Sequence, residues 1–173
     1  MSEAKFVSRA VRKKDAQALV TGKPVYTGDL VPAGALTVKL LRSPHARAWI
    51  EEIDCTAAMK IPGVVAIYTW QDVPQSRFTT AGQTYPEPSP YDRLILDRQI
   101  RCAGDPVAIV AAETPEAARK ALDRIKVRYQ VQEPLLDFTK AKDNPIVVHP
   151  EENFRTLCDV GTDASRNLCS TEQ

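Results

Sequence analysis

Ser43 and His45 are the two residues whose types and spacing come nearest to a catalytic pair, since a serine hydroxyl becomes a nucleophile when a histidine takes its proton. They flank Pro44 in the segment RSPHAR. No third group that would orient the imidazole is evident, and adjacency in sequence does not supply the geometry of a triad. We therefore expect a structural turn, and a small hydrolase using Ser43 and His45 is the last-ranked alternative.

The same segment carries three side chains suited to protein contacts. Arg42, His45 and Arg47 lie within six residues of one another. A guanidinium group offers a planar fork of donors that matches a carboxylate. Arg42, His45 and Arg47 are therefore our candidate interface residues.

The glycines, cysteines and histidines of the chain are not spaced as they are in cofactor-binding or metal-binding motifs. A phosphate or dinucleotide cradle needs closely spaced glycines, but the seven glycines are scattered and form neither GxGxxG nor a P-loop. The four cysteines contain no Cys-x-x-Cys pair, and the chain has only two histidines. The sequence therefore predicts no catalytic, cofactor-binding or metal-binding residue within this chain.

Composition narrows the class of protein. The chain has 173 residues, of which 43% are hydrophobic and 26% charged, which is typical of one globular domain, alone or with a tail. A formal net charge of +1 lacks the basic excess of nucleic-acid-binding proteins. No apolar run is long enough to span a bilayer, and the N-terminus is not a secretory signal. We expect a cytoplasmic protein with reduced thiols.

The first half of the chain shows several short elements. Residues 36–42 (LTVKLLR) predict a strand, and apolar residues alternate with polar ones over 46–51, which indicates a strand with one buried face. Asp54 is a suitable N-cap for a short helix over 55–60, and residues 64–69 (VVAIYT) predict another strand.

A long segment, Gln75–Arg93, follows without a clear periodic pattern. Its prolines at alternate positions, Pro86, Pro88 and Pro90, favour extended, polyproline-like backbone. Such a segment is either a solvated loop or one held by a partner, and the sequence leaves both interpretations open.

Residues 107–131 contain the clearest pattern in the chain. VAIVAA at 107–112 predicts a buried strand, and Thr114-Pro115-Glu116 is a strong helix start. Alternating residues then predict a strand over 127–131. We expect a βαβ unit with parallel strands, and hence an α+β or mixed α/β fold. The predicted organisation is an N-terminal arm (1–14), a main domain (15–143) and a final segment (144–173).

Four segments in order resemble one known family. They are DAQALVTGKPVYTGDL from Asp15, LRSPHAR from Leu41, IDCTAAMKIPGVVAIYTWQD from Ile53, and the stretch from Ile100 to Asp137. The series is similar to the N-terminal α/β hammerhead domain of the molybdopterin-binding large subunit in the xanthine dehydrogenase and aldehyde oxidase family. By this resemblance, residues 144–173 are a linker or the truncated start of the molybdopterin-binding domain.

The resemblance implies a role within a larger enzyme. Members of this family oxidise purines, other nitrogen heterocycles or aldehydes, with water as the oxygen source. It implies molybdenum–molybdopterin in the full-length subunit, with 2Fe-2S and FAD on partner subunits. The glycine-rich pterin-binding segments and the glutamate base of the family have no match here. We therefore expect a non-catalytic fragment whose partners are the rest of that subunit and the iron–sulfur and FAD subunits.

Two expectations follow from the fragment interpretation. The chain ends with VGTDASRNLCSTEQ, which resembles the start of a next domain, so it would be a truncated, split or degraded gene product. An apolar patch would then be left where the missing protein normally packs. Such a patch would favour self-association. The alternative is a stand-alone protein-interaction module derived from such an enzyme.

Overall fold

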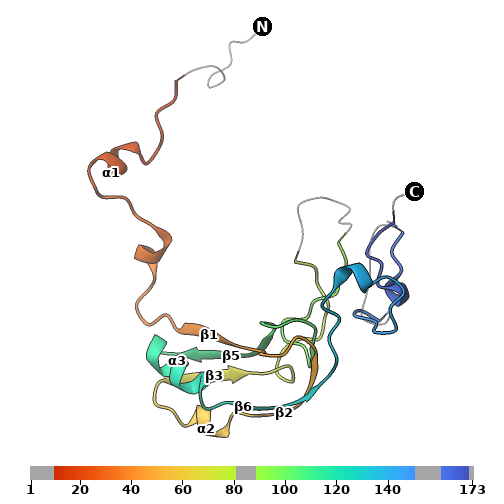
Figure 1. Cartoon of the computed structure of the whole chain (residues 1–173). Helices are drawn as coiled ribbons and strands as arrows, with labels where there is room; N and C mark the ends of the chain where they lie inside the picture. The colour runs from red at the N-terminus through yellow and green to blue at the C-terminus, as the bar shows by residue number, and fades with distance from the viewer. Residues whose placement is uncertain (1–9, 81–88, 151–160, 172–173) are drawn as a thin grey trace. The chain divides into compact units, whose positions relative to one another are not determined.

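The computed structural model describes residues 10–80, 89–150 and 161–171. The chain forms two compact units, residues 1–35 and residues 36–173. The strands of the described residues all lie in the second unit, and they are labelled in Figure 1 where there is room. Over the described ranges, no helix has the length and apolar character required to cross a membrane.

The helices and 3-10 turns are short. They are α1 (Ala16–Val20), η1 (Thr27–Leu30), α2 (Thr56–Met59), α3 (Pro115–Leu122), η2 (Phe138–Lys140) and η4 (Ala164–Arg166). The strands are β1 (Thr37–Arg42), β2 (Ala48–Asp54), β3 (Val64–Tyr68), β4 (Gln99–Ile100), β5 (Pro106–Ala112) and β6 (Lys126–Val131). The strands predicted from alternation and apolar runs are all present, and this mixture of helices and sheets confirms the α+β class.

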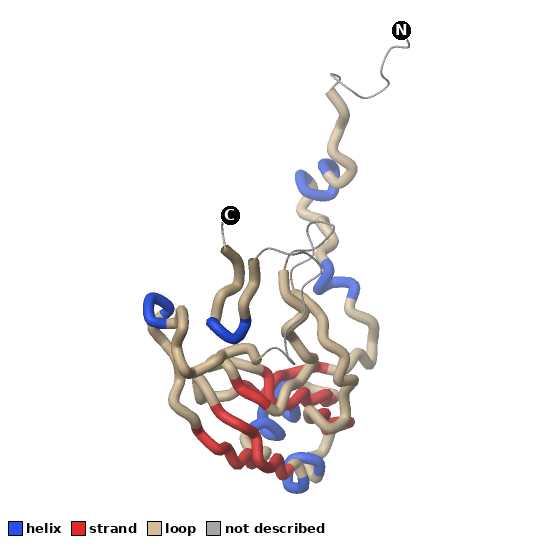
Figure 2. Tube along the Cα trace, turned by 90° about the vertical axis from the view of Figure 1, so that its right-hand side faces the viewer, coloured by secondary structure: helices blue, strands red, loops and turns tan. Residues whose placement is uncertain are grey.

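The strands form two three-stranded sheets with the orders β1-β5-β3 and β4-β2-β6. Each of the pairings between these described strands is antiparallel. Figure 2 shows the strands of both sheets gathered in one part of the molecule. The predicted parallel βαβ unit over residues 107–131 is therefore wrong in its pairing, although its strand–helix–strand order is right. β5 lies between β1 and β3, whereas β6 pairs with β2 in the other sheet.

The helix α3 begins where the sequence predicts. The Thr114 hydroxyl accepts a hydrogen bond from the Ala117 N–H at 3.1 Å, and Pro115 occupies the first turn. Ala117, Ala118 and Ala121 are buried on one face of the helix. The small alanine side chains let α3 lie close to the sheet, where they pack with buried β5 residues.

Two hydrophobic clusters form the core of the second unit. One joins α3 to the alternate β5 residues Ala108, Val110 and Ala112. The other surrounds β2 and β4 and contains Ala48, Ile50, Ile100 and Val107. Leu41, Ile53 and Val127 pack against both clusters, so the two sheets share one continuous apolar interior.

The helix predicted over 55–60 is shorter than expected. The Asp54 carboxylate accepts the Thr56 N–H at 2.9 Å, as a capping residue would, but α2 covers Thr56–Met59 with Cys55 at its N-cap position. Hydrogen bonding to the ionised form lowers the pKa of Asp54. Ala58 is the residue that α2 buries.

The Gln75–Arg93 segment is described only at its two ends. Phe78 and Arg93 form an isolated antiparallel bridge, with backbone hydrogen bonds of 2.9 and 3.1 Å that bring these ends together. The polyproline expectation at Pro86 and Pro88 lies outside the described residues. The choice between a solvated loop and a partner-held segment stays open.

Candidate functional site

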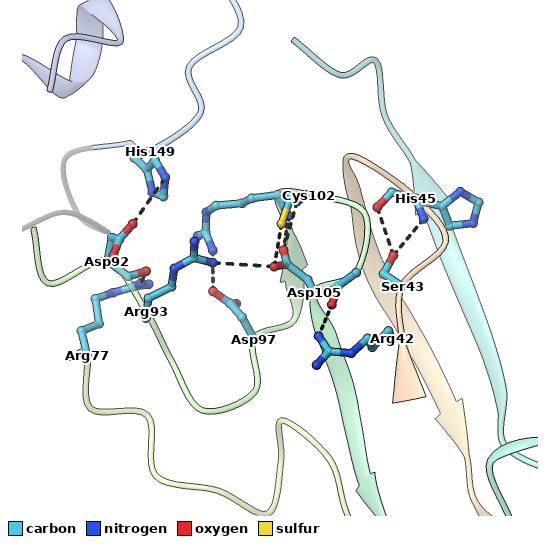
Figure 3. Close-up of polar contacts among 12 residues, drawn as sticks. Arg42, Ser43, His45, Arg77, Asp92, Arg93, Asp97, Cys102, Asp105 and His149 are labelled. Atoms are coloured by element: carbon cyan, nitrogen blue, oxygen red, sulfur yellow. Dashed lines mark hydrogen bonds and ion pairs between the residues drawn. The ribbon is translucent and has the colours of Figure 1, made fainter. Parts of the chain in front are cut away.

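Ser43 lies in the turn between β1 and β2, and its hydroxyl bonds to the main chain of that turn. Oγ accepts the His45 N–H at 3.0 Å and donates to the His45 carbonyl at 3.1 Å, as Figure 3 shows. Ser43 is only 4% exposed, and its own N–H donates to the Asp105 carbonyl at 2.9 Å. The serine therefore holds a turn closed, as the sequence predicts.

The imidazole of His45 packs against Tyr129 of β6. The two ring centroids lie 4.8 Å apart, and the rings meet at 71° in an edge-to-face arrangement. Burial raises the pKa of Tyr129, and a hydrogen bond with Ser43 opposes this shift. The hydroxyl of Ser43 is thus engaged by the main chain of the turn, and the hydrolase alternative gains no support from this geometry.

The arginines at the two ends of the turn tie it to separate segments of the fold. Arg42 Nη1 donates to the Gly104 carbonyl at 2.8 Å, and Arg47 Nη1 donates to the Glu133 carbonyl at 3.0 Å. The structure therefore places Arg42 at the end of β1 and His45 and Arg47 in the turn that follows, each with a contact inside the chain. Their interface role stays a prediction.

Asp105 organises the loop before β5. Its Oδ2 accepts the N–H groups of Arg101 and Cys102 at 2.8 and 3.1 Å, and its Oδ1 accepts the Cys102 thiol at 3.0 Å. Arg93 Nη1 lies 3.7 Å from Oδ1. Burial raises the pKa of Asp105, but the hydrogen bonds and Arg93 outweigh burial, so the net pKa is lowered. Asp105 is therefore an ionised centre of a local turn.

Arg101 connects this loop to β4. Its Nη1 forms an ion pair with Asp97 at 2.7 Å, and its Nη2 donates to Gln99 Oε1 at 2.7 Å. The side chain is 10% exposed. Sequence reasoning missed this network, although the acids four residues before and after Arg101, namely Asp97 and Asp105, were a readable signal.

A second polar contact joins the end of the Gln75–Arg93 segment to the segment after η2. His149 Nε2 lies 3.6 Å from Asp92 Oδ2, and Arg77 Nη1 donates to the Asp92 carbonyl at 3.1 Å. Burial lowers the pKa of His149, and Arg101 adds to the shift while Asp92 opposes it. These contacts draw together three segments that are far apart in the sequence.

A groove of about 300 Å³ opens beside this network. Its walls are mainly apolar, and its polar lining comes from Arg47, Gln99, Arg101 and Cys102. The apolar wall residues are Ala46, Ala103, Pro134, Leu135, Leu136, Ile146 and Val148. A groove of this composition suits an apolar side chain or a small apolar group.

Metal-ligating side chains and the glycines were the remaining candidates for a binding site. Within that part of the chain, no three His, Cys, Asp or Glu side chains gather. Gly34 and Gly104 have positive φ, and a Cβ atom at either position would meet no heavy atom within 4 Å. These two glycines therefore serve turns whose backbone conformation would be strained with a side chain.

A family model matches most of this fold. Residues 21–133 match the family described as "Aldehyde oxidase and xanthine dehydrogenase, a/b hammerhead domain". The matched range contains every strand of both sheets.

Curated relatives cover the same region. The probable hypoxanthine oxidase XdhD of Escherichia coli K12 is 42% identical over 151 residues, which are 86% of this chain and 16% of the relative. A xanthine dehydrogenase molybdenum-binding subunit of Escherichia coli O157:H7 is 40% identical over 120 residues, covering 67% of this chain and 16% of the relative. The chain thus spans about a sixth of the length of these relatives.

Solved structures share the fold. The aldehyde oxidoreductase of Desulfovibrio gigas aligns with a TM-score of 0.66 and 30% identity, over 80% of this chain and 16% of that chain. Quinoline 2-oxidoreductase of Pseudomonas putida 86 aligns with a TM-score of 0.65 and 30% identity, over 80% and 18%. Sequence, fold and strand content together show that this chain belongs to the aldehyde oxidase and xanthine dehydrogenase family, as its a/b hammerhead domain.

Proposed function

We propose that this chain is a structural domain of a molybdenum hydroxylase large subunit and is not catalytic by itself. The observation that carries the proposal is the family match over residues 21–133, in a chain that spans only 16% of its curated relatives. The role of the domain is to pack against the cofactor-bearing remainder of the subunit and to hold it in place.

The chemistry of the whole subunit follows from its family. The relatives and solved neighbours have names that refer to hypoxanthine, xanthine, aldehydes and quinoline. We propose oxidation of purines, other nitrogen heterocycles or aldehydes with water as the oxygen source. Molybdenum–molybdopterin belongs to the remainder of the subunit in this proposal, and 2Fe-2S and FAD belong to partner subunits in the cytoplasm.

The polar groups of the chain support a structural role. The Ser43 hydroxyl closes a turn, the Asp105 carboxylate caps main-chain N–H groups, and Arg101 is neutralised by Asp97. Each of these groups is occupied by the fold itself. A catalytic acid, base or nucleophile has to be available to a substrate.

Turnover measurements test the proposal. The chain supplied with molybdenum cofactor and either a purine or an aldehyde is expected to give no oxidation, whereas co-expression with the remainder of a homologous subunit is expected to give a metal-containing complex. Robust turnover by the chain alone would falsify the proposal. Native mass spectrometry of the endogenous protein gives polypeptide length, metal content and companions in one measurement.

A second candidate is a stand-alone interaction module derived from such an enzyme. The exposed apolar side chains Val38 and Tyr68 favour protein contacts under either interpretation. The transcript beyond the Gln173 codon separates the two candidates. Continued coding into glycine-rich segments supports the enzyme subunit, and an immediate stop supports the module.

A further inference from the structure

One face of the β1-β5-β3 sheet is apolar and lies opposite α3. The helix packs against Ala108, Val110 and Ala112 of β5, and neighbouring residues of a strand point to opposite faces. Ile109 and Ala111 therefore point away from α3. We call this second face of the sheet the outer face.

Strand register identifies the other members of the outer face. Residues directly opposite in an antiparallel sheet share a face. Ala111 pairs with Val38 of β1 and Ala66 of β3, and Ile109 pairs with Leu40 of β1 and Tyr68 of β3. The outer face thus consists of two apolar rows across three strands: Val38, Ala111 and Ala66, then Leu40, Ile109 and Tyr68.

The composition of the outer face is unlike that of a sheet surface in water. An antiparallel sheet with one solvated face normally carries polar side chains there. All six residues of the outer face are uncharged, and Val38 and Tyr68 are 58% and 45% exposed. A contiguous apolar surface of this kind marks an interaction site.

We propose that the outer face is the surface on which the remainder of the molybdopterin-binding subunit packs, through an apolar, uncharged surface of its own. This inference rests on the proposed function. The relatives and solved neighbours carry the same domain as only 16–18% of a longer chain, so most of each polypeptide is available to cover such a face. Covering it removes apolar area from water, which favours association.

Fragment complementation tests the inference. The whole 173-residue chain is co-expressed with Escherichia coli K12 XdhD from which the matched segment has been removed, and the complex is recovered through a tag on XdhD. The double variant Val38→Glu/Tyr68→Glu places two carboxylates on the outer face. We expect it to reduce recovery of the chain by about tenfold or more, because desolvating a charge against an apolar surface is strongly unfavourable.

Val131→Glu is the matched control. Val131 is 59% exposed on β6, an edge strand of the other sheet, so it resembles Val38 in residue type and exposure. We expect this variant to be recovered like the wild type. Val38→Thr/Tyr68→Thr keeps residues suited to strands, and we expect it to lower recovery several-fold, with circular dichroism melting showing that each variant is folded.

The outcomes separate the inference from the function on which it rests. If the wild type binds and the folded Val38→Glu/Tyr68→Glu variant binds equally well, the outer face is not the docking surface, and the proposed function stands. If the wild type fails where the segment of XdhD itself succeeds, the proposed function fails for this chain. A wild-type homodimer that is lost in the double variant, and that truncated XdhD does not displace, would assign the face to a second copy instead.

Discussion

The guanidinium of Arg98 lies over the indole ring of Trp70, with Cζ 5.4 Å from the ring centroid. The same Cζ lies 5.8 Å from the ring centroid of Trp49, and Arg98 Nε donates to the Ile50 carbonyl at 2.8 Å. One arginine therefore links β2, the end of β3 and the segment before β4. Cation–π attraction and the hydrogen bond act together to hold these three places.

Replacing Arg98 tests this link. Arg98→Lys keeps the charge but removes the Nε–H donor and the planar group above the rings, so we expect the free energy of unfolding to fall by about 1 kcal/mol. Urea denaturation measures the change, with Arg124→Lys, at an exposed arginine after α3, as the control. Equal unfolding midpoints for both variants would show that the contacts of Arg98 do not stabilise the fold.

The cap of α3 is the subject of a second prediction. Thr114→Ala leaves the Ala117 N–H without its side-chain acceptor, which now lies at 3.1 Å, and we expect a loss of about 1 kcal/mol in the free energy of unfolding. Thr114→Ser keeps the hydroxyl and is expected to stay within a few tenths of a kcal/mol of the wild type. Thermal denaturation distinguishes the two, and a Ser variant as unstable as the Ala variant would contradict the capping role.

The alanine face of α3 gives a third prediction. Ala118 is fully buried between the helix and the sheet, so Ala118→Leu has to push α3 away from β5. We expect a cost of about 1–3 kcal/mol in the free energy of unfolding. Lys120→Leu, at an exposed position of the same helix, is the control for the leucine itself. A stability for Ala118→Leu equal to that of the control would mean that the interface has unfilled space.

The sequence predicts the local elements better than their partners. Alternation indicates which residues of a strand face inward, and the Thr114 cap marks the start of a helix. The strand β6 and the helix α3 were therefore predicted from the sequence. The neighbour of each strand depends on contacts between distant residues, such as Val38 with Ala111 and Ile50 with Tyr129. A short helix between two strands favours parallel pairing, but here the two strands entered different sheets.

In the candidate site too, the local turn could be predicted from the sequence, but the contacts between charged side chains could not. The Ser43 turn was predicted because the sequence offers no third group to orient His45, and the structure confirms a turn. The Asp97, Arg101 and Asp105 network was missed, because charges spaced by four residues are read as helical pairs, whereas Asp97 lies just before β4 and the other two lie in the loop after it. The residues of the outer face could not be assigned from the sequence, because each of the two alternating sets of β1 residues contains both apolar and polar side chains.

His149 gives a prediction for acid titration. Its pKa lies below the ordinary value of 6.5 because burial and Arg101 disfavour the imidazolium, with Asp92 opposing them. The unfolded chain therefore binds a proton before the folded one, so stability falls as the pH decreases from about 6.5 toward the folded pKa. NMR titration is expected to show an imidazole midpoint below 6.5, and lower still in Asp92→Asn. A midpoint unchanged by Asp92→Asn would contradict the contact.

Asp105 gives the complementary prediction at lower pH. Hydrogen bonds from Cys102 and the Arg101 N–H, together with Arg93, hold its pKa below 3.8 despite burial. Its contribution to stability is therefore complete above the unfolded-state pKa and is lost as the pH falls through the folded pKa. In Asp105→Asn, which keeps the shape but not the charge, we expect lower stability at pH 7 and a weaker dependence of stability on pH below about 4. Asp123→Asn, at an exposed position, is the control. Urea denaturation across this pH range measures both effects, and parallel pH profiles for Asp105→Asn and the wild type would show that the carboxylate does not hold the loop through its charge.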